Sequence, residues 1–348
     1  MSELAALVAS IAPPSAEGES AARRHLDSLT KPPGSLGRLE EIALRLAVLR
    51  GRAPEVARPV IFTFAADHGV VAEGVSAYPQ VVTAQMVENF ARGGAAVNVL
   101  ARHAGARVVV ANFGVATPMP HSPELRECAI GPGTGNIAIG PAMQREQAVR
   151  AIETGARLAA EAMDAGADLL ATGEMGIGNT TAASAITAAI TQSAPERVTG
   201  RGTGVDDAAL SRKVEAVRRA LAVNRPDPHD GLDVLAKVGG FEIGGLAGVI
   251  LAGTRRAAGA GGARRIHRGR GSAGRGHARA RRASRALRLA SLGRARPRPP
   301  ACAPRARAVS GPRAAPRRGH WRRVVRASRT GGGTRLERDG HVQERRDK

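Results

Sequence analysis

Apolar residues recur at two different spacings along the chain. Residues 17–29 and 38–49 place them three and four positions apart, which predicts two amphipathic helices. From residue 60 the pattern changes to a short apolar run, residues 60–66, which is rich in β-branched and aromatic side chains and predicts a buried strand. We therefore expect residues 1–55 to form a small helical part that precedes a domain of a different class.

Strand and helix patterns alternate through the middle of the chain. This alternation predicts an α/β fold, a Rossmann-like parallel sheet with helices on both faces. Ligands in such sheets bind beyond the carboxyl ends of the strands, so the loops after residues 66 and 171 are candidate sites. The predicted domain, residues 56–253, has strands at 60–66, 107–111 and 168–171, helices at 83–103, 146–165 and 206–221, an alanine-rich helix after 181, and an apolar glycine-rich segment at 239–253.

Charge is spread very unevenly over the 348 residues. The chain has 52 basic and 30 acidic residues, and its net charge of +22 is typical of a nucleic-acid-binding protein. Yet 29 of the basic and 4 of the acidic residues lie in residues 254–348, so this tail carries +25 and the preceding 253 residues carry −3. The tail also lacks hydrophobic periodicity, which predicts a disordered segment outside the folded domain.

The chain shows no pattern of an exported or membrane protein. Cys128 and Cys302 are too few for a disulfide framework, and no apolar run reaches the roughly 18 residues that a membrane span needs. No signal-peptide pattern is present. These observations favour a cytoplasmic protein that does not bind membranes.

A glycine-rich segment, residues 173–181, separates a predicted strand from a predicted helix. Gly176 and Gly178 let the backbone pass close to a ligand, and the helix start at Asn179 and Thr180 favours an anion such as a phosphate. No lysine follows the second glycine, so the segment is not a Walker A loop, and no downstream acid completes a dinucleotide fingerprint. An ordinary capped turn explains the same residues equally well.

A second glycine-rich loop, residues 199–207, also precedes a predicted helix. It contains Gly202, Thr203 and Gly204, and Lys213 follows about two turns into that helix. Two such loops and a lysine would suit one phosphate. The alternative is a capped surface loop with a solvated lysine.

Two further groups near these loops are candidates for chemistry. Glu174 lies inside the first loop, where a carboxylate suits a cationic or protonated part of a substrate; alternatively it only complements the helix dipole. Asp67 and His68 follow the first strand without a second histidine cluster or a nucleophile elbow, so turn and helix-cap roles are favoured and no metal site is indicated.

The loop at residues 73–80 brings an aromatic side chain and amides to the end of the first strand. Tyr78 and, shortly after it, Gln85 would suit a flat apolar ligand with one or two polar atoms. Met86 and Phe90 are expected to be ordinary core positions of the following helix.

Taken together, these segments resemble the nicotinate-nucleotide:dimethylbenzimidazole phosphoribosyltransferase family, which assembles the lower ligand of cobalamin. The resemblance covers residues from about 20 to 253. The matching motifs follow one another in the family's order, at residues 31–37, 65–69, 74–80, 91–96, 133–136, 173–181 and 200–207.

The resemblance implies a homodimer that transfers phosphoribose from nicotinate mononucleotide to 5,6-dimethylbenzimidazole. Nicotinate is released, α-ribazole 5′-phosphate is formed, and neither a cofactor nor a metal is required. Glu174 matches a glutamate near the reacting centre, and Tyr78 and Gln85 match the benzimidazole pocket. The residues expected to hold the phosphate and ribose are Gly176, Gly178, Asn179, Thr180, Gly202, Thr203, Gly204 and Lys213.

One segment of the family is absent from this chain. The family's main catalytic base belongs to a Gly-Glu-Gly-Thr-Gly segment near its C-terminus, and the chain contains no such segment. We therefore expect the 348-residue chain to be catalytically impaired.

The tail matches the family in a shifted reading frame. With synonymous codons and a forward shift of one nucleotide, residues 317–322 can encode Gly-Glu-Gly-Thr-Gly, and His320 and Trp321 leave little freedom in that reading. Residues 257–268, 290–298 and 339–347 match further family motifs in the same frame and order. We interpret residues 254–348 as the product of a frameshift.

Two other functions fit parts of the sequence. The arginine-rich tail would bind nucleic acid in a bifunctional protein, but it offers one aromatic residue for stacking, Trp321, and no recognition module, so no specific nucleic-acid partner is expected. A pseudoenzyme would bind nicotinate mononucleotide without turning it over.

Overall fold

A computed structural model describes residues 3–11, 16–50, 55–202 and 204–261, and the statements below concern these residues. The predicted disorder of the basic tail lies outside the described residues, as does Thr203. Among the described helices, none is long and apolar enough to cross a membrane. The predicted cytoplasmic location stays a prediction.

A parallel sheet of four strands forms the centre of the fold. The strands are β1 (Pro59–Ala66), β2 (Arg107–Gly114), β3 (Leu125–Glu127) and β4 (Leu169–Met175), and their order is β3-β2-β1-β4. All three pairings are parallel, which confirms the predicted α/β class. Within the described residues β4 pairs only with β1 and is therefore an edge strand, and Ala171 and Thr172 in it are exposed.

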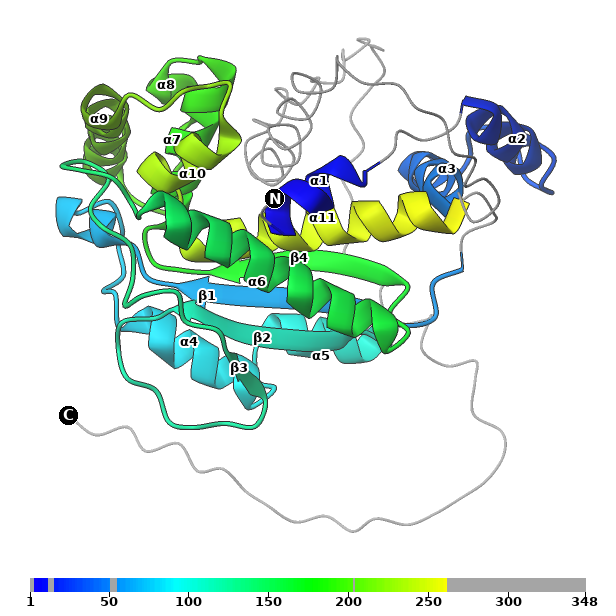
Figure 1. Ribbon diagram of the computed structural model, residues 1–348, viewed down its shortest axis with the longest axis horizontal. Coiled ribbons are helices and arrows are strands. Elements are labelled where there is room, and N and C mark those ends of the chain that lie inside the picture. Colours follow the sequence, from blue (N-terminus) through cyan, green and yellow to red (C-terminus); the bar gives the residue numbers. More distant parts are fainter. Residues whose placement is uncertain (1–2, 12–15, 51–54, 203, 262–348) are drawn as a thin grey trace, which may run out of the picture. The chain divides into compact units, whose positions relative to one another are not determined.

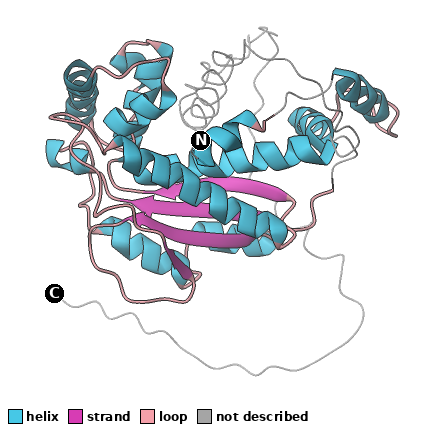
Figure 2. Ribbon diagram, in the orientation of Figure 1, coloured by secondary structure: helices cyan, strands magenta, loops and turns pink. Residues whose placement is uncertain are grey.

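Helices cover both faces of the sheet, as predicted (Figure 2). Helices α6 (Arg145–Asp164) and α11 (Phe241–Gly261) lie on one face, and α4 (Val82–Ala91) and α5 (Ala96–His103) lie on the other. The apolar glycine-rich segment at 239–253 forms most of α11. This helix runs past residue 253, and the predicted domain boundary there stays a prediction.

The prediction of one helix over 83–103 is wrong, because α4 and α5 are separate. Gly93 lies between them with φ +75°, a left-handed conformation that a continuous right-handed helix does not contain. A Cβ on the neighbouring Gly94 would lie 2.4 Å from Oδ1 of Asn89, so the chain turns tightly here. Apolar residues keep a helical spacing across this break, so the sequence pattern did not indicate that the helix ends there.

The core between the sheet and α11 combines aromatic rings with close helix contacts. The rings of Phe64 and Phe113 stack with centroids 4.4 Å apart, and both side chains are fully buried. Helices α6 and α11 approach each other so closely that a Cβ on Gly155 would lie 1.8 Å from the carbonyl oxygen of Gly245. A Cβ on Gly248 would similarly lie 1.9 Å from the carbonyl oxygen of Ile152.

Three helices precede the sheet. The two predicted ones are confirmed as α2 (Ala16–Asp27) and α3 (Arg38–Arg50), which pack against each other (Figure 1). Helix α3 also contacts α11. The short α1 (Glu3–Ala9) was not predicted, and it packs on α6 and α11, where Leu4 N donates to Glu153 Oε1 at 3.0 Å.

A group of helices gathers beyond the carboxyl ends of the strands (Figure 1). The predicted helices in this group are α7 (Asn179–Thr191) and α9 (Asp207–Asn224). The short α8 (Pro195–Val198) and α10 (Gly231–Val238) pack with them, and the 3-10 helix η1 (Gly69–Glu73) contacts α9. The loops expected to carry chemistry therefore lie where these helices begin.

Candidate functional site

The loops after β1 and β4 are neighbours because these two strands pair along their whole length. Ala65 pairs with Met175, so both strands end at the same level of the sheet. The backbone N–H of Ile177 donates to the hydroxyl of Thr83 at 3.1 Å, and Thr83 is fully buried. The start of α4 is thereby joined to the glycine-rich loop after β4.

The first glycine-rich loop is tightly packed at two of its glycines. A Cβ on Gly176 would lie 2.4 Å from the carbonyl oxygen of Ala66. Gly178 has φ +91°, and a Cβ there would lie 2.9 Å from Cγ2 of Val71. Because Gly178 is the N-cap residue of α7, no side chain caps the helix start, which is compatible with an anionic ligand at that position.

Lys213 connects the two glycine-rich loops. Its ammonium group donates to the hydroxyl of Thr180 at 2.7 Å and to the carbonyl oxygen of Gly200 at 3.1 Å. Gly202 has φ +58°, and a Cβ there would lie 3.0 Å from the Thr180 hydroxyl and 3.2 Å from Nζ of Lys213. Gly204 also has a positive φ, +98°. The structure thus brings both loops and the lysine together, which was one of the two arrangements considered from the sequence.

The environment of Lys213 is unusual for a lysine. Its side chain is only 1% exposed, and both of its acceptors are neutral oxygens. Burial lowers the pKa of Lys213 from the ordinary 10.5 to about 8. A solvated surface lysine, the alternative considered from the sequence, is therefore wrong. A buried cation with neutral partners is well placed to receive an anion.

Glu174 lies in a strand, so the prediction that it belongs to the loop is wrong. It pairs with Phe64 near the end of β4 and is half-buried. The strand continues to Met175 because backbone pairing with β1 does not depend on apolar side chains. Glu174 nevertheless lies two residues before Gly176, at the edge of the phosphate-loop candidate.

The two residues expected to bind an aromatic base are both exposed. Tyr78 is 49% exposed in the loop after η1, and Gln85 is exposed on α4 two residues after Thr83. The bond from Thr83 to the loop after β4 keeps this turn of α4 beside the site. Phe90 is buried and Met86 packs against the same core cluster, as predicted.

A buried cluster next to the loop was missed by the sequence reasoning. His68 Nε2 lies 2.9 Å from Glu242 Oε1, which also accepts from the side-chain amide of Asn179. The prediction of a capping role for His68 is wrong for its side chain, which makes no cap hydrogen bond at η1. The side chain of Asp67 instead makes a long-range contact, since it accepts from the backbone N–H of Ala116 at 2.8 Å. The one available signal was a lone acidic residue, Glu242, in an apolar segment.

Among the residues that the structure describes, no group of histidine, cysteine or acidic side chains could hold a metal ion. The chemical resources of the site are backbone groups at two glycine-rich loops, one buried amine and nearby carboxylates. This set is suited to holding a phosphate monoester beside a group that can accept a proton.

Comparison with known proteins identifies the family. The family described as phosphoribosyltransferase matches residues 11–258. A nicotinate-nucleotide–dimethylbenzimidazole phosphoribosyltransferase of Chloroflexus aggregans is 56% identical over 257 residues, which are 74% of this chain and 73% of that protein. The enzyme of the same description from a Roseiflexus species shows the same identity and coverage.

Two solved structures from Thermus thermophilus have a similar fold. One, described as a phosphoribosyltransferase of the same specificity, is 51% identical, with 70% of this chain and 72% of that chain covered and a TM-score of 0.64. The other, described as CobT, is 44% identical, with 79% and 95% covered and a TM-score of 0.64. The chain therefore belongs to the nicotinate-nucleotide–dimethylbenzimidazole phosphoribosyltransferase family.

Proposed function

We propose that the site binds nicotinate mononucleotide and directs its phosphoribose to 5,6-dimethylbenzimidazole, a step in cobalamin synthesis. The observation that carries this proposal is the buried ammonium group of Lys213, which joins two glycine-rich loops through neutral oxygens only. A 5′-phosphate would supply the negative charge that neutralises this ammonium group. Gly176, Gly178, Asn179 and Thr180 from one loop and Gly202, Thr203 and Gly204 from the other complete the phosphate and ribose subsite.

The reaction makes modest demands on the protein. An azole nitrogen attacks C1′ of the ribose, the bond from C1′ to the pyridinium nitrogen breaks, and nicotinate leaves with the bonding electrons. The leaving group needs no protonation because the pyridinium nitrogen becomes neutral. The azole proton must pass to a base, and such general-base catalysis typically contributes a factor of about 10² to 10⁴.

The acceptor base is assigned to the exposed face that Tyr78 and Gln85 provide beside the loop. Glu174, half-buried next to Gly176, is the carboxylate of the described residues that we place nearest the reacting centre. No cofactor takes part in this scheme, and the protonated amine of Lys213 supplies the positive charge that a metal ion supplies in many phosphate sites.

We further propose that the 348-residue chain binds nicotinate mononucleotide but turns it over poorly. It lacks the Gly-Glu-Gly-Thr-Gly segment that the family resemblance associates with the main base. The family match ends at residue 258, close to the change in charge at residue 254, which supports a change of reading frame there. The strongly basic tail is then an out-of-frame product and has no specific nucleic-acid partner.

The test compares two purified proteins, the 348-residue chain with its mass confirmed and a chain in which the frame is shifted back near codon 254. We expect both to bind nicotinate mononucleotide in calorimetry, and only the second to release nicotinate at a rate typical of an enzyme. Lys213→Ala is the negative control for binding, and Lys237→Ala, which removes an ion pair with Asp233, is the matched control. Equal turnover by both chains would contradict the proposal that the 348-residue chain is catalytically impaired.

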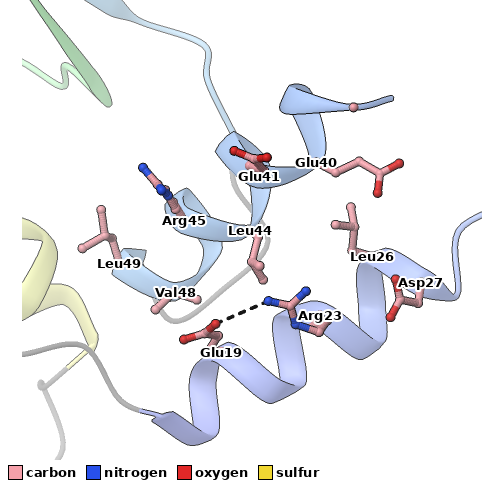
Figure 3. A pocket seen from close by; sticks show the side chains of 11 residues that line it. Glu19, Arg23, Leu26, Asp27, Glu40, Glu41, Leu44, Arg45, Val48 and Leu49 are labelled. Atoms are coloured by element: carbon pink, nitrogen blue, oxygen red, sulfur yellow. Dashed lines mark hydrogen bonds and ion pairs between the residues drawn. The ribbon is translucent and has the colours of Figure 1, made fainter. Parts of the chain in front are cut away.

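We propose a homodimer formed through α2 and α3. Apolar side chains are exposed along this pair, including Leu36 at 51%, Leu39 at 64% and Ile42 at 52%. A groove of about 660 Å³ between the two helices adds the apolar Leu26 and Leu44, with charged residues at its margin (Figure 3). Exposed apolar surface of this kind is typical of a self-association interface.

A further inference from the structure

A buried carboxylate lies next to the glycine-rich loop. Glu242 is the second residue of α11, and its side chain has no exposed surface. Its Oε1 accepts from His68 Nε2 at 2.9 Å and from the side-chain amide of Asn179, whereas its Oε2 is buried without a hydrogen-bond partner. Burial of a carboxylate is unfavourable, so its position in the otherwise apolar segment 239–253 requires compensation from these bonds.

The bonds of Glu242 join three elements that meet at the loop. His68 follows β1, Asn179 is the first residue of α7, and Glu242 lies in the first turn of α11. The His68 ring also fills the space beside the loop, because a Cβ on Gly176 would lie 3.3 Å from its Nε2. A Cβ on Gly178 would lie 3.1 Å from Cβ of His68. Movement of the ring or of the Asn179 amide would therefore move the loop.

We propose that Glu242 is a positioning residue for nucleotide binding. Through Asn179 and His68, its Oε1 holds residues 176–180 in the conformation that receives the phosphate. The identity of the ligand rests on the proposed function, but the positioning of the loop is measurable without any ligand.

Three backbone amides report on the loop in hydrogen-exchange measurements. Ile177 N donates to Thr83 Oγ1 at 3.1 Å, Asn179 N to Gly176 O at 3.0 Å, and Thr181 N to Gly178 O at 2.9 Å. If Glu242 positions the loop, loss of its side chain opens these bonds more often and speeds the exchange of all three amides.

The exchange experiment uses the full 348-residue chain. We expect Glu242→Ala to speed exchange of the three amides about tenfold, the effect of losing a hydrogen bond to a charged group. Glu242→Gln should exchange the three amides at nearly the parent's rate. The Oε1 of a glutamine still accepts hydrogen bonds, and the Oε2 atom that its amide group replaces has no donor partner to lose. Val249→Ala is the control, since this buried residue lies about two turns further along α11.

Binding of nicotinate mononucleotide, measured by calorimetry on the same variants, supplies the functional readout. We expect about tenfold weaker binding for Glu242→Ala and for Asn179→Ala, and a loss in the double variant that is smaller than the sum of the two single losses, because the Glu242–Asn179 hydrogen bond is common to both. Val249→Ala should lower the melting temperature without changing the dissociation constant. Additive losses, or a Glu242→Gln variant as weak as Glu242→Ala, would overturn the proposal.

The two measurements separate the proposed positioning from the proposed function. If the parent binds no nicotinate mononucleotide but exchange responds as expected, the proposed function fails and the role of Glu242 in positioning the loop stands. If exchange in Glu242→Ala matches that of the parent, the positioning role fails even when the parent binds the nucleotide.

Discussion

The ammonium group of Lys213 donates to the hydroxyl of Thr180 at 2.7 Å, and this bond connects the second turn of α9 to the first turn of α7. Both helices begin at glycine-rich loops, so the bond fixes the position of one loop relative to the other. Because the other acceptor of Lys213 is a backbone carbonyl, the charge of the buried ammonium group is not neutralised by its hydrogen-bond partners. An anionic ligand would be held by the lysine and both loops together.

Removal of the Lys213 charge should weaken nucleotide binding without unfolding the protein. Lys213→Met keeps a side chain of similar length but leaves no ammonium group for the phosphate, and the loss of a charge-assisted hydrogen bond corresponds to roughly 1.5–3 kcal/mol. We expect the dissociation constant of nicotinate mononucleotide to rise about 10- to 100-fold in calorimetry. Lys237→Met, which removes a half-buried ion pair with Asp233, should bind like the parent. Similar affinities for both variants would show that the phosphate binds elsewhere.

The lowered pKa of Lys213 predicts a pH dependence of binding. In the free protein the amine loses its proton above a pH of about 8, whereas a bound phosphate dianion favours the charged form. Affinity should therefore fall by up to about tenfold per pH unit between pH 8 and the pKa of the complex, with proton uptake on binding. Calorimetry from about pH 7 to 9.5, in buffers of different ionisation enthalpy, measures the dissociation constant and the proton uptake at each pH. Lys213→Met should show neither effect in this range.

The same shift affects the stability of the ligand-free protein. Between pH 8 and 10.5 the unfolded chain holds a proton on Lys213 that the folded chain has released. The unfolded state binds more protons in this window, so this residue makes the free energy of unfolding rise with pH there. Its contribution is unfavourable below pH 8, where the folded protein must bury a charged amine.

The sequence was sufficient for the architecture, whereas the binding roles of the site residues stay predictions. Local spacing predicted β1, β2, β4 and most helices but not the short β3, and it left open whether the two glycine-rich loops meet at Lys213 or form a surface loop with a solvated lysine. Glu174 was misplaced because backbone pairing extended β4 beyond the apolar residues that mark a strand. Glu242 was missed because its partners are His68 and Asn179, which lie 174 and 63 residues away, and spacing carries no information on such contacts.

Gly202 should be more sensitive to substitution than its neighbour Gly200. Gly202 has φ +58°, and an added Cβ would lie 3.0 Å from the Thr180 hydroxyl, whereas a Cβ on Gly200 meets nothing within 4 Å. Gly202→Ala should cost about 1–2 kcal/mol of strain and raise the dissociation constant of the nucleotide about tenfold. Gly200→Ala should retain the parent's affinity and melting temperature. The prediction fails if the two variants bind equally well.

Charge on the exposed face of α3 should disrupt self-association. Leu39 and Ile42 are 64% and 52% exposed, and glutamate at both positions would place two charges in the proposed dimer interface. We expect sedimentation equilibrium to show a dimer for the parent and a monomer for the double variant, with unchanged melting of the sheet domain at low concentration. Val223→Glu, at a position 53% exposed on α9, is the control and should remain dimeric. A monomeric parent would contradict the proposal directly.

Two glycines of α11 should respond oppositely to the same substitution. A Cβ on Gly248 would lie 1.9 Å from the carbonyl oxygen of Ile152 in α6, so Gly248→Ala forces the two helices apart. Overpacking of this kind typically costs about 1–3 kcal/mol. A Cβ on Gly253 would meet Leu170 Cδ1 at an ordinary 3.4 Å, and alanine favours the helix over glycine by up to about 1 kcal/mol. In thermal denaturation Gly248→Ala should therefore melt below the parent and Gly253→Ala at or above it. Equal melting temperatures for the two variants would mean that the close contact between α6 and α11 does not exist in solution.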